Sequence, residues 1–179
     1  MLMKIISISR GKRVIVDDED YDRLISMGPW FATAVVHGSG GPYAVRKTSR
    51  KKHPAGKQKT ELMHRIIMRA KKGEMIDHIN GNGLDNRKVN LRFCTASTNQ
   101  MNRKSVRGST SKFKGVCWNK KANKWQSQIK LNGVVMFVGL YEREFMAARA
   151  YDRAAREHHG KFARLNFPDQ KKRKTTEHV

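Results

Sequence analysis

The feature that most constrains the fold is a turn pair, Asn132-Gly133, between two runs of alternating side chains. The runs are "KWQSQIKL" at residues 124–131 and "VVMFVGLY" at residues 134–141, and Asn-Gly is typical of the tight turn that joins antiparallel strands. A shorter run, "FKGVCW" at 113–118, predicts a third strand. In "REFMAARAYDRAAREHHG", apolar residues recur at helical spacing, which predicts a helix over 143–160. The C-terminal part is therefore predicted to be a three-stranded antiparallel sheet with one helix.

The N-terminal part alternates short strand-like runs with polar turns as far as about residue 70. "RVIVDD", "PWFATAVV" and "PYAVRKT" predict strands, and "DEDYDRLISMG" predicts a short helix. The basic segment "RKTSRKKHPAGKQKTELMH" is predicted to be a loop or hairpin that enters a strand at Leu62 and Met63. The acidic residues at 17–20 suit the start of a helix, so we assign them no metal. This part is predicted to be small and mixed α/β.

The charge of the chain indicates its partner. Lys and Arg number 38 against 15 acidic residues, a formal net charge of +23, which attracts polyanions such as nucleic acid or an anionic membrane. No apolar run reaches the roughly 20 residues that span a bilayer, and the first residues lack the apolar core of a signal peptide. We expect an intracellular, cytoplasmic protein. Two cysteines, Cys94 and Cys117, are too few for a disulfide framework, and no structural zinc is expected.

A second motif, "DHINGNGLDNRKVNLRFCTASTNQMN" at 77–102, carries the candidate chemistry. Hydrolysis of a phosphodiester needs a base that activates water and a cation that stabilises negative charge. A helix at "STNQMNR" would bring Asn99 beside the carboxylate of Asp77, and such oxygens suit Mg²⁺. From these residues alone the argument is weak, because an Asp-His pair in a strand is more often structural than catalytic and Asn-Gly is simply a good turn.

This motif is similar to the signature of HNH endonucleases, in the branch found in phage and intron homing enzymes, over residues 60 to 102. The resemblance implies a ββα-metal module in which His78 is the general base. Asp77 and Asn99 would hold one Mg²⁺ or Mn²⁺, and Asn90 would tie down the loop between hairpin and helix that orients the histidine. Cys94 is followed three residues later by Ser97, so the zinc-binding cysteine pairs of other HNH branches are absent.

Basic residues around this motif are candidates for phosphate contacts, with solvated surface charge as the equal alternative. In the module these are Arg65, Lys88 and Arg92. The segment "NRKSVRGSTSK" reads as a basic linker, and it contributes Arg103, Lys104 and Arg107. His64 also recurs in this branch before the motif, and we expect it to pack or to support the site rather than to react.

The last part, residues 111–168, resembles the DNA-binding domain of the plant Apetala and ethylene-response transcription factors. "FKGV", "KW", "AARAYDRAA" and "LNFP" stand in the order of that family. The resemblance implies a sheet that enters the major groove of DNA. One side of the central strand carries Gln126, Gln128 and Lys130, which suit base edges and phosphates. The further DNA contacts expected are Lys114, Lys120, Lys121 and Lys124. Cys117, Asn119 and Gln128 depart from the plant pattern, so base preference does not transfer.

Together these observations predict an α+β chain with a nuclease part at 1–101, a linker at 102–111, a DNA-binding domain at 112–168 and a disordered basic tail at 169–179. The predicted function is a site-specific, metal-dependent DNA endonuclease of the homing type, encoded by a phage or mobile element. We expect a monomer that binds double-stranded DNA, with no membrane and no small-molecule substrate. The alternatives are a DNA-binding regulator with an inactive nuclease module and a ribonuclease. The ribonuclease is disfavoured because A-form RNA hides its major groove.

Overall fold

A computed structural model describes residues 2–34, 41–48, 58–103 and 108–168. The chain divides into two compact units, Met1–Arg103 and Lys104–Val179, and each is considered by itself. The described residues contain both helices and strands, which confirms the α+β class. Among the helices of these ranges, none is long and apolar enough to cross a bilayer.

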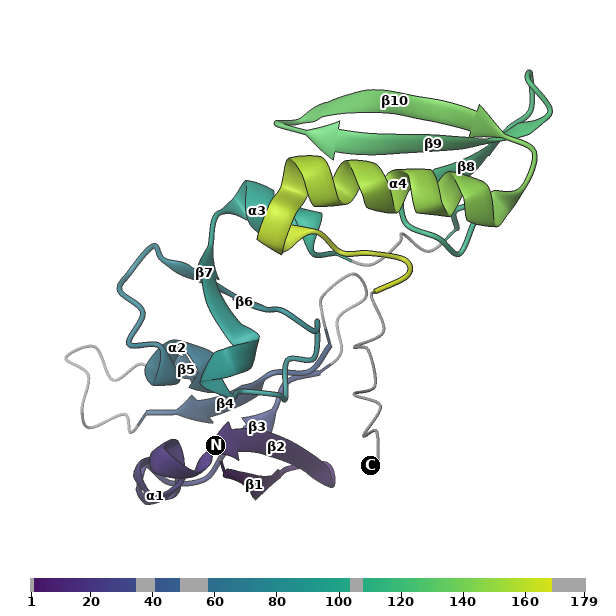
Figure 1. The fold of residues 1–179 in the computed structure, drawn as a ribbon. Helices are drawn as coiled ribbons and strands as arrows, with labels where there is room; N and C mark the ends of the chain where they lie inside the picture. Colours follow the sequence, from purple (N-terminus) through teal and green to yellow (C-terminus); the bar gives the residue numbers. More distant parts are fainter. Residues whose placement is uncertain (1, 35–40, 49–57, 104–107, 169–179) are drawn as a thin grey trace, which may run out of the picture. The chain divides into compact units, whose positions relative to one another are not determined.

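The first unit begins with an antiparallel hairpin and a helix (Figure 1). Strand β1 (Met3–Ile8) pairs with β2 (Lys12–Asp17), and α1 (Asp18–Ser26) follows directly. In β2, Val14 and Val16 alternate with more exposed residues and are fully buried, as a half-buried strand requires. Three acidic residues occupy the first turn of α1, where the helix dipole favours them. The predicted strand and helix are confirmed here.

A small antiparallel sheet of β3 (Phe31–Ala32), β4 (Ala44–Lys47) and β5 (Thr60–Leu62) comes next. The strand predicted to include Met63 is wrong, because β5 stops at Leu62 and helix α2 (Met63–Ile67) begins there. Met63 and Ile67 are four residues apart on one side of this helix, and both are buried in the core. The strand predicted in "PWFATAVV" is reduced to two residues. The turn "HGSGG", between "PWFATAVV" and "PYAVRKT", falls mostly within residues 35–40, and the basic loop falls mostly within 49–57. Both ranges lie outside the described residues.

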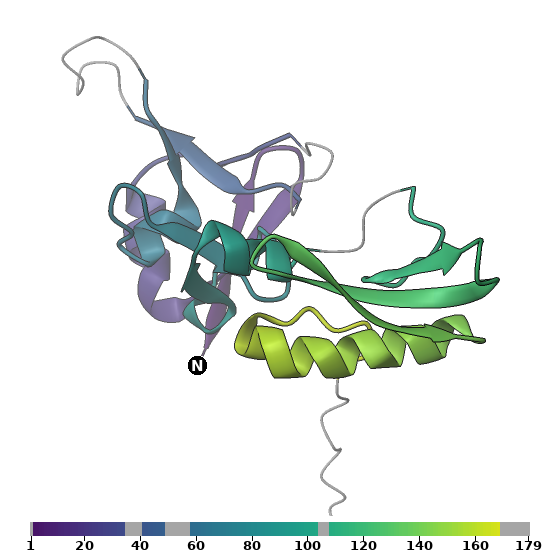
Figure 2. The ribbon, with the colours of Figure 1, turned by 90° about the horizontal axis from the view of Figure 1, so that it is seen from above.

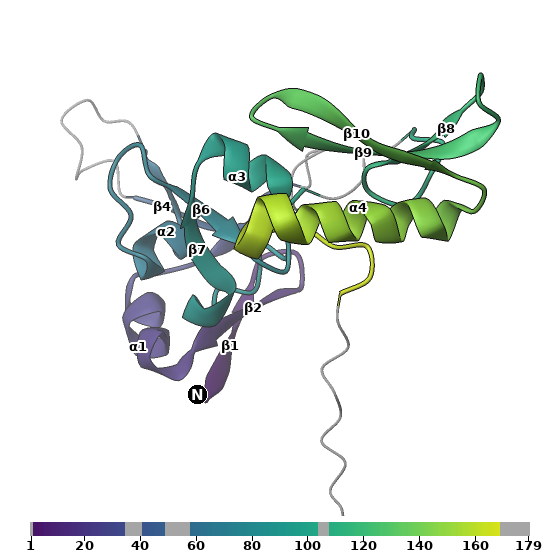
Figure 3. The same cartoon turned by 45° about the horizontal axis from the view of Figure 1, so that its top comes forward.

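The motif region forms a hairpin followed by a helix (Figure 3). Strand β6 (Met75–His78) pairs with β7 (Leu91–Cys94), the 3-10 turn η2 (Lys88–Asn90) precedes β7, and α3 (Ala96–Met101) follows it. Helix α3 starts at Thr95 because a capping box forms there. The Thr98 N–H donates to Thr95 Oγ1 at 3.2 Å, and the Thr95 N–H donates to Thr98 Oγ1 at 2.8 Å. The arrangement is ββα, as the motif predicts.

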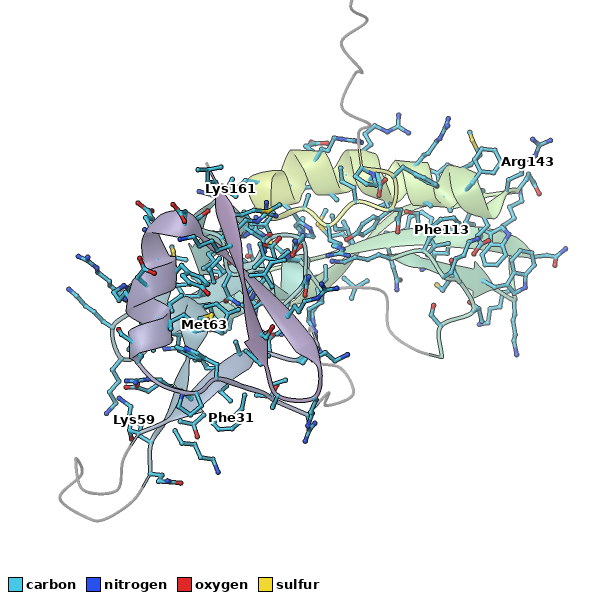
Figure 4. The ribbon with its side chains drawn as sticks, turned by 90° about the horizontal axis from the view of Figure 1, so that it is seen from below. Phe31, Lys59, Met63, Phe113, Arg143 and Lys161 are labelled. Atoms are coloured by element: carbon cyan, nitrogen blue, oxygen red, sulfur yellow. The ribbon has the colours of Figure 1, made fainter. Side chains whose placement is uncertain are left out.

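One apolar core joins these elements of the first unit. Figure 4 labels Met63 inside it, and its members come from β1, β2, α1, the small sheet, α2 and β7. Leu84 and Leu91, from the motif itself, belong to the same core. The motif is therefore packed against the N-terminal hairpin through this shared core.

The second unit is the sheet and helix expected from the Asn-Gly turn. Strands β8 (Val116–Asn119), β9 (Lys124–Leu131) and β10 (Val134–Tyr141) pair antiparallel in the order β10-β9-β8. Helix α4 (Glu144–His159) runs along one face, and the 3-10 turn η3 (Gly160–Phe162) ends it (Figure 2). Ser127 and Ile129 of β9 are buried on the helix side, as the alternation predicts.

The helix is held to the segment after it by a buried carboxylate. Asp152 Oδ1 and Oδ2 accept the backbone N–H groups of Asn166 and Phe167 at 2.8 and 2.7 Å. The Asn166 side chain in turn bonds both backbone groups of Lys114, at 2.7 and 3.1 Å. The segment "LNFP" thus connects helix α4 with the backbone just before β8. Asp152 therefore has a structural role.

Candidate active site

Asp77 and His78 are the last two residues of β6, and both side chains are buried, with 7% and 5% of their surface exposed. The strand register pairs Asp77 with Arg92 and His78 with Leu91. A buried carboxylate next to a buried imidazole is costly unless each has a partner. The partners of these two side chains therefore define what the site can do.

His78 is held by a side chain that the sequence analysis missed. Its Nε2 lies 3.3 Å from Oδ1 of Asn86. The Asn86 Nδ2 donates to the carbonyl of Gly83, so the oxygen of that amide faces the histidine. Since an amide oxygen only accepts, Nε2 carries the proton and Nδ1 keeps a lone pair. Burial lowers the pKa of His78, and the bond to Asn86 opposes that shift. A neutral imidazole with an available Nδ1 is the form that a general base needs.

Asn86 itself is fixed by the N-terminal hairpin. Its backbone N–H donates to the carbonyl of Ile15 at 2.8 Å, and the Ile15 N–H donates to Leu84 at 2.9 Å. Only 1% of Asn86 is exposed. The contact joins residues 71 positions apart in the chain, from Ile15 to Asn86. For that reason no local pattern could have assigned Asn86 to the site.

Two further rings pack against the imidazole of His78. The ring centroid of His64 lies 4.9 Å away in an edge-to-face arrangement, and that of Tyr43 lies 5.7 Å away. Burial, with contributions from His78 and Arg65, lowers the pKa of His64 to about 3. His64 therefore stays neutral and fixes the ring of His78 by packing. This agrees with the supporting role expected for it.

Among the described residues, Arg92 and Asn102 hydrogen-bond to the carboxylate of Asp77. Arg92 donates to Asp77 Oδ2 from Nε at 3.0 Å and from Nη2 at 2.7 Å. Nδ2 of Asn102 donates to both carboxylate oxygens at 3.1 and 3.0 Å, and to the carbonyl of His78 at 2.9 Å. Asn102, the residue that ends α3, was not predicted. Asn99, which was, lies one turn earlier in α3 with a half-buried side chain.

The residues at Asp77 fit a hard divalent cation in their donor chemistry. They offer a carboxylate, and Asn102, directly after α3, brings one amide side chain to it through Nδ2. Arg92 pairs with the carboxylate here, and this ion pair offsets part of the cost of burying Asp77. A cation at Asp77 would have to compete with this ion pair. Asp77 and Asn99 as the two ligands stay a prediction.

Asn90 ties down the loop between the two strands. Its Nδ2 donates to the carbonyl of Asp85 at 2.8 Å and to Asn80 Oδ1 at 3.1 Å, while its Oδ1 accepts the Asn80 N–H at 3.0 Å. The loop that it holds is therefore the one between β6 and β7. The expected loop between hairpin and helix is a different one, and that detail is corrected. Since His78 begins this loop, Asn90 fixes the backbone on which the histidine stands.

Comparison with known proteins connects this geometry to a family. Residues 61–101 match the family model described as HNH endonuclease. Protein 3.8 of Escherichia phage T7 is 35% identical over 95 residues, which cover 52% of this chain and 77% of the phage protein. The chain belongs to the family of that phage protein. The site built from Asp77 and His78 lies within its HNH endonuclease domain.

A part of this family member is also similar to plant proteins. An AP2-like ethylene-responsive transcription factor of Arabidopsis thaliana is 35% identical over 65 residues, which cover 36% of this chain and 13% of the plant protein. An APETALA2-like protein 2 of Oryza sativa subsp. indica is also 35% identical over 65 residues, and the matched part is 15% of the length of that protein. The chain spans only a small part of these plant relatives.

An acidic cluster next to the HNH domain has a structural explanation. Carboxylate oxygens of Asp17, Glu19 and Asp20 lie within 4.8 Å of one another. The Lys88 backbone N–H donates to Asp17 at 2.7 Å, and Lys88 Nζ lies 2.6 Å from Glu19 and 3.3 Å from Asp20. The ammonium group thus supplies the positive charge that a metal would bring. The cluster holds the turn that leads to Asn90.

The other predicted DNA contacts lie in several places. Arg65 donates to the backbone carbonyls of Glu74 and Lys71, and Arg92 is paired with Asp77. Arg103 follows α3, whereas Lys104 and Arg107 fall outside the described residues. In the second unit the predicted contacts are Lys114 before β8, Lys120 and Lys121 in the turn after it, and Lys124, Gln126, Gln128 and Lys130 on β9. Lys124 forms an ion pair with Glu142 at 2.9 Å. Phosphate contact by these residues stays a prediction.

Proposed function

We propose that this chain is a site-specific, metal-dependent DNA endonuclease of the homing type, acting as a monomer in the cytoplasm of a phage-infected host cell. One observation carries the proposal. His78 is buried, its Nε2 is occupied by Asn86, and it directly follows the buried Asp77 inside the HNH domain. With its proton held on Nε2, the imidazole keeps the Nδ1 lone pair that a general base uses to accept a proton from water. The phage relative supports the same class of protein.

The chain's own residues have these roles in the proposed reaction. His78 takes a proton from the attacking water at Nδ1, while Asn86 keeps the proton of the ring on Nε2. His64 and Tyr43 hold the ring in place. Asn90 holds the loop after His78. A Mg²⁺ or Mn²⁺ bound by Asp77 and Asn99 would stabilise the negative charge on the phosphate and on the leaving oxygen.

The second unit would set the position of the cut. Its basic residues and the outward side chains of β9 are proposed to bind duplex DNA, with the linker residues Arg103, Lys104 and Arg107 adding phosphate contacts. One histidine site per chain cuts one strand at a time. We therefore propose that nicking comes first, and that a double-strand break needs a second event.

Metal removal tests this function. A supercoiled plasmid that contains the target is expected to be nicked with Mg²⁺ or Mn²⁺ and to stay intact with EDTA, because the water and the phosphate need the cation. Gel electrophoresis measures the nicks, and sequencing of the ends locates the site. Specific binding by gel shift, without a cut in any divalent cation, would instead support a DNA-binding regulator with an inactive nuclease module. Faster cutting of RNA would favour the ribonuclease.

The role of Asn86 can be separated from its packing by two variants. Asn86→Ala removes the acceptor for His78 Nε2 and is expected to lower the single-turnover cleavage rate by roughly 10- to 100-fold. Asn86→Asp keeps an acceptor at that position and is expected to retain a rate within a few-fold of wild type. Both variants lose the N–H that donates to Gly83, so this bond is matched between them. Equal rates for the two variants would refute the tautomer role, and ¹⁵N NMR of the imidazole reads the tautomer directly.

A further inference from the structure

The second unit has an exposed apolar stripe on the side of its sheet that faces away from α4. The stripe lies on β10 and consists of Val135, Phe137 and Leu140, with 55%, 62% and 39% of their surface exposed. Figure 3 shows α4 on one face of the sheet, and we call the opposite side the outer face. Large apolar side chains on the outside of a strongly basic protein call for an explanation.

The strand register assigns each residue of the stripe a polar neighbour. Across from β10, Val135 pairs with Lys130, Phe137 with Gln128, and Leu140 with Gln126. Directly paired side chains on one face of a sheet are in contact range, about 5 Å between their Cβ atoms. The register shifts between Phe137 and Gly139, which turns Val138 into the core on the helix side. The outer face therefore presents an apolar row directly beside a polar row.

The polar row is a ladder of amides with a fixed direction. The Ala122 backbone N–H donates to Asn119 Oδ1 at 3.0 Å. Asn119 Nδ2 then donates to Gln126 Oε1 at 2.8 Å, and Gln126 Nε2 donates to Gln128 Oε1 at 3.0 Å. A backbone N–H can only donate, so every amide in the ladder is oriented by the one before it. The ladder ends in the N–H donors of Gln128 Nε2, next to the ring of Phe137.

We propose that Gln128 and Phe137 form a thymine-reading pair that contacts one thymine in the major groove of duplex DNA. This inference rests on the proposed DNA-cleaving function and names a base that its target must contain. In the major groove, thymine exposes an acceptor, O4, next to a C5-methyl group. Gln128 Nε2 donates to O4 while the ring of Phe137 covers the methyl group. The hydrogen-bond donor and the apolar ring are neighbours on the protein, just as O4 and the methyl group are neighbours on thymine.

The other bases match this pair less well. Recognition of adenine by a glutamine uses the amide oxygen as an acceptor for N6, but one lone pair of Gln128 Oε1 already accepts from Gln126, and adenine has no methyl group for Phe137. Cytosine presents an amino donor to a donor and has no methyl group. Guanine accepts from Gln128 but offers nothing to Phe137. Thymine alone uses both members of the pair.

Charge favours DNA over a protein as the occupant of the outer face. Lys130 extends the polar row, and Lys120 and Lys121 are exposed in the turn at the other end of β9. With a net charge of +23 on the whole chain, a polyanion is attracted to this face before any base is read. In this arrangement the apolar row would contact base edges in the major groove, while the surrounding lysines contact the phosphates on either side of the groove.

Base analogues test the pair. Sites are first selected from random duplex DNA by the full chain in EDTA, which prevents cutting. Each thymine of the selected site is then replaced, one at a time, by deoxyuridine, which lacks only the methyl group. At one position we expect the Kd to rise about fourfold, the effect of exposing one methyl group. Replacing that T·A pair by 5-methylcytosine·G keeps the methyl but exchanges the acceptor for a donor, and it should weaken binding about tenfold or more.

The variants assign these effects to residues. Phe137→Ala is expected to bind thymine and deoxyuridine equally at that position, and Gln128→Met to bind thymine and 5-methylcytosine equally. Phe145→Ala, which removes an exposed phenylalanine of α4, is the matched control and should keep both preferences. Wild-type affinity that does not respond to deoxyuridine anywhere would overturn the inference. It would do so whether or not the plasmid is cut with Mg²⁺, so this failure is distinguishable from failure of the nuclease. A drop in oligomeric mass for Phe137→Ala, with equal affinity for both bases in wild type, would assign the stripe to a contact between copies of the chain.

Discussion

Replacing His78 by alanine is expected to lower the single-turnover rate of DNA cleavage by roughly 10²- to 10⁴-fold, the usual contribution of a general base. The variant loses the Nδ1 that would accept the proton of water, and among the described residues of the first unit no other imidazole can take its place. His64 is the nearest one, but its pKa of about 3 makes it a far weaker base, and its side chain is packed in the site. DNA affinity should be unchanged, since His78 is not one of the proposed DNA-binding residues.

His158→Ala is the matched control for this experiment. His158 is an exposed histidine of α4, so its removal changes the histidine content without touching the site. The rates are measured at saturating protein on one end-labelled duplex, and the affinities by gel shift in EDTA. If His78→Ala and His158→Ala cut at the same rate, His78 is not the base.

Gly115→Ala is expected to have the largest effect on stability, a loss of about 3 kcal/mol or more in the free energy of unfolding of the second unit. Gly115 has a φ of +74°, which disfavours any residue with a Cβ. An added Cβ would also lie 2.0 Å from Cδ2 of Tyr151 and 2.6 Å from the carbonyl oxygen of Gln128. Tyr151 is 2% exposed and packs against Ile129, so the ring has no room to move.

Urea unfolding followed by the fluorescence of Trp118 and Trp125 measures this loss, because both lie in the second unit. Gly133→Ala is the control. Gly133 also has a positive φ, +87°, but an added Cβ there meets nothing within 4 Å. It should cost only about 1 kcal/mol of backbone strain. If the two variants lost the same stability, close packing at Gly115 would not be the cause.

The second unit could be predicted almost completely from local patterns. Alternation in β9 and β10, the turn at Asn132-Gly133 and the spacing of apolar residues in α4 are signals that span only a few residues each. The structure confirms the strands and the helix to within a few residues. Even the side of β9 that faces the core follows from alternation. The two-residue turn also fixes the register from Leu131 and Val134 as far as Gln128 and Phe137, whereas the shift after Phe137 could not be predicted from alternation.

The candidate site was predictable only in part. Asp77, His78 and Asn90 stand in a recognisable motif, whereas Asn86 and Asn102 became visible only through their contacts. The spacing of Asn99 and Asn102 on one helix could have suggested both amides, because residues three apart share a face. Asn86 owes its position to a bond with Ile15, and Lys88 owes its own to the acidic cluster in α1 and β2. Such contacts between distant segments leave no periodic trace in the sequence.

The measurement that tests the central claim most directly is chemical rescue of His78→Ala. Single-turnover cleavage by this variant is followed in Mg²⁺ with increasing imidazole, beside the wild-type chain. The account predicts that wild type cuts quickly, that the variant cuts slowly, and that imidazole raises the variant's rate by entering the space that His78 left. A variant that cuts as fast as wild type without imidazole would contradict the assignment of His78 as the base.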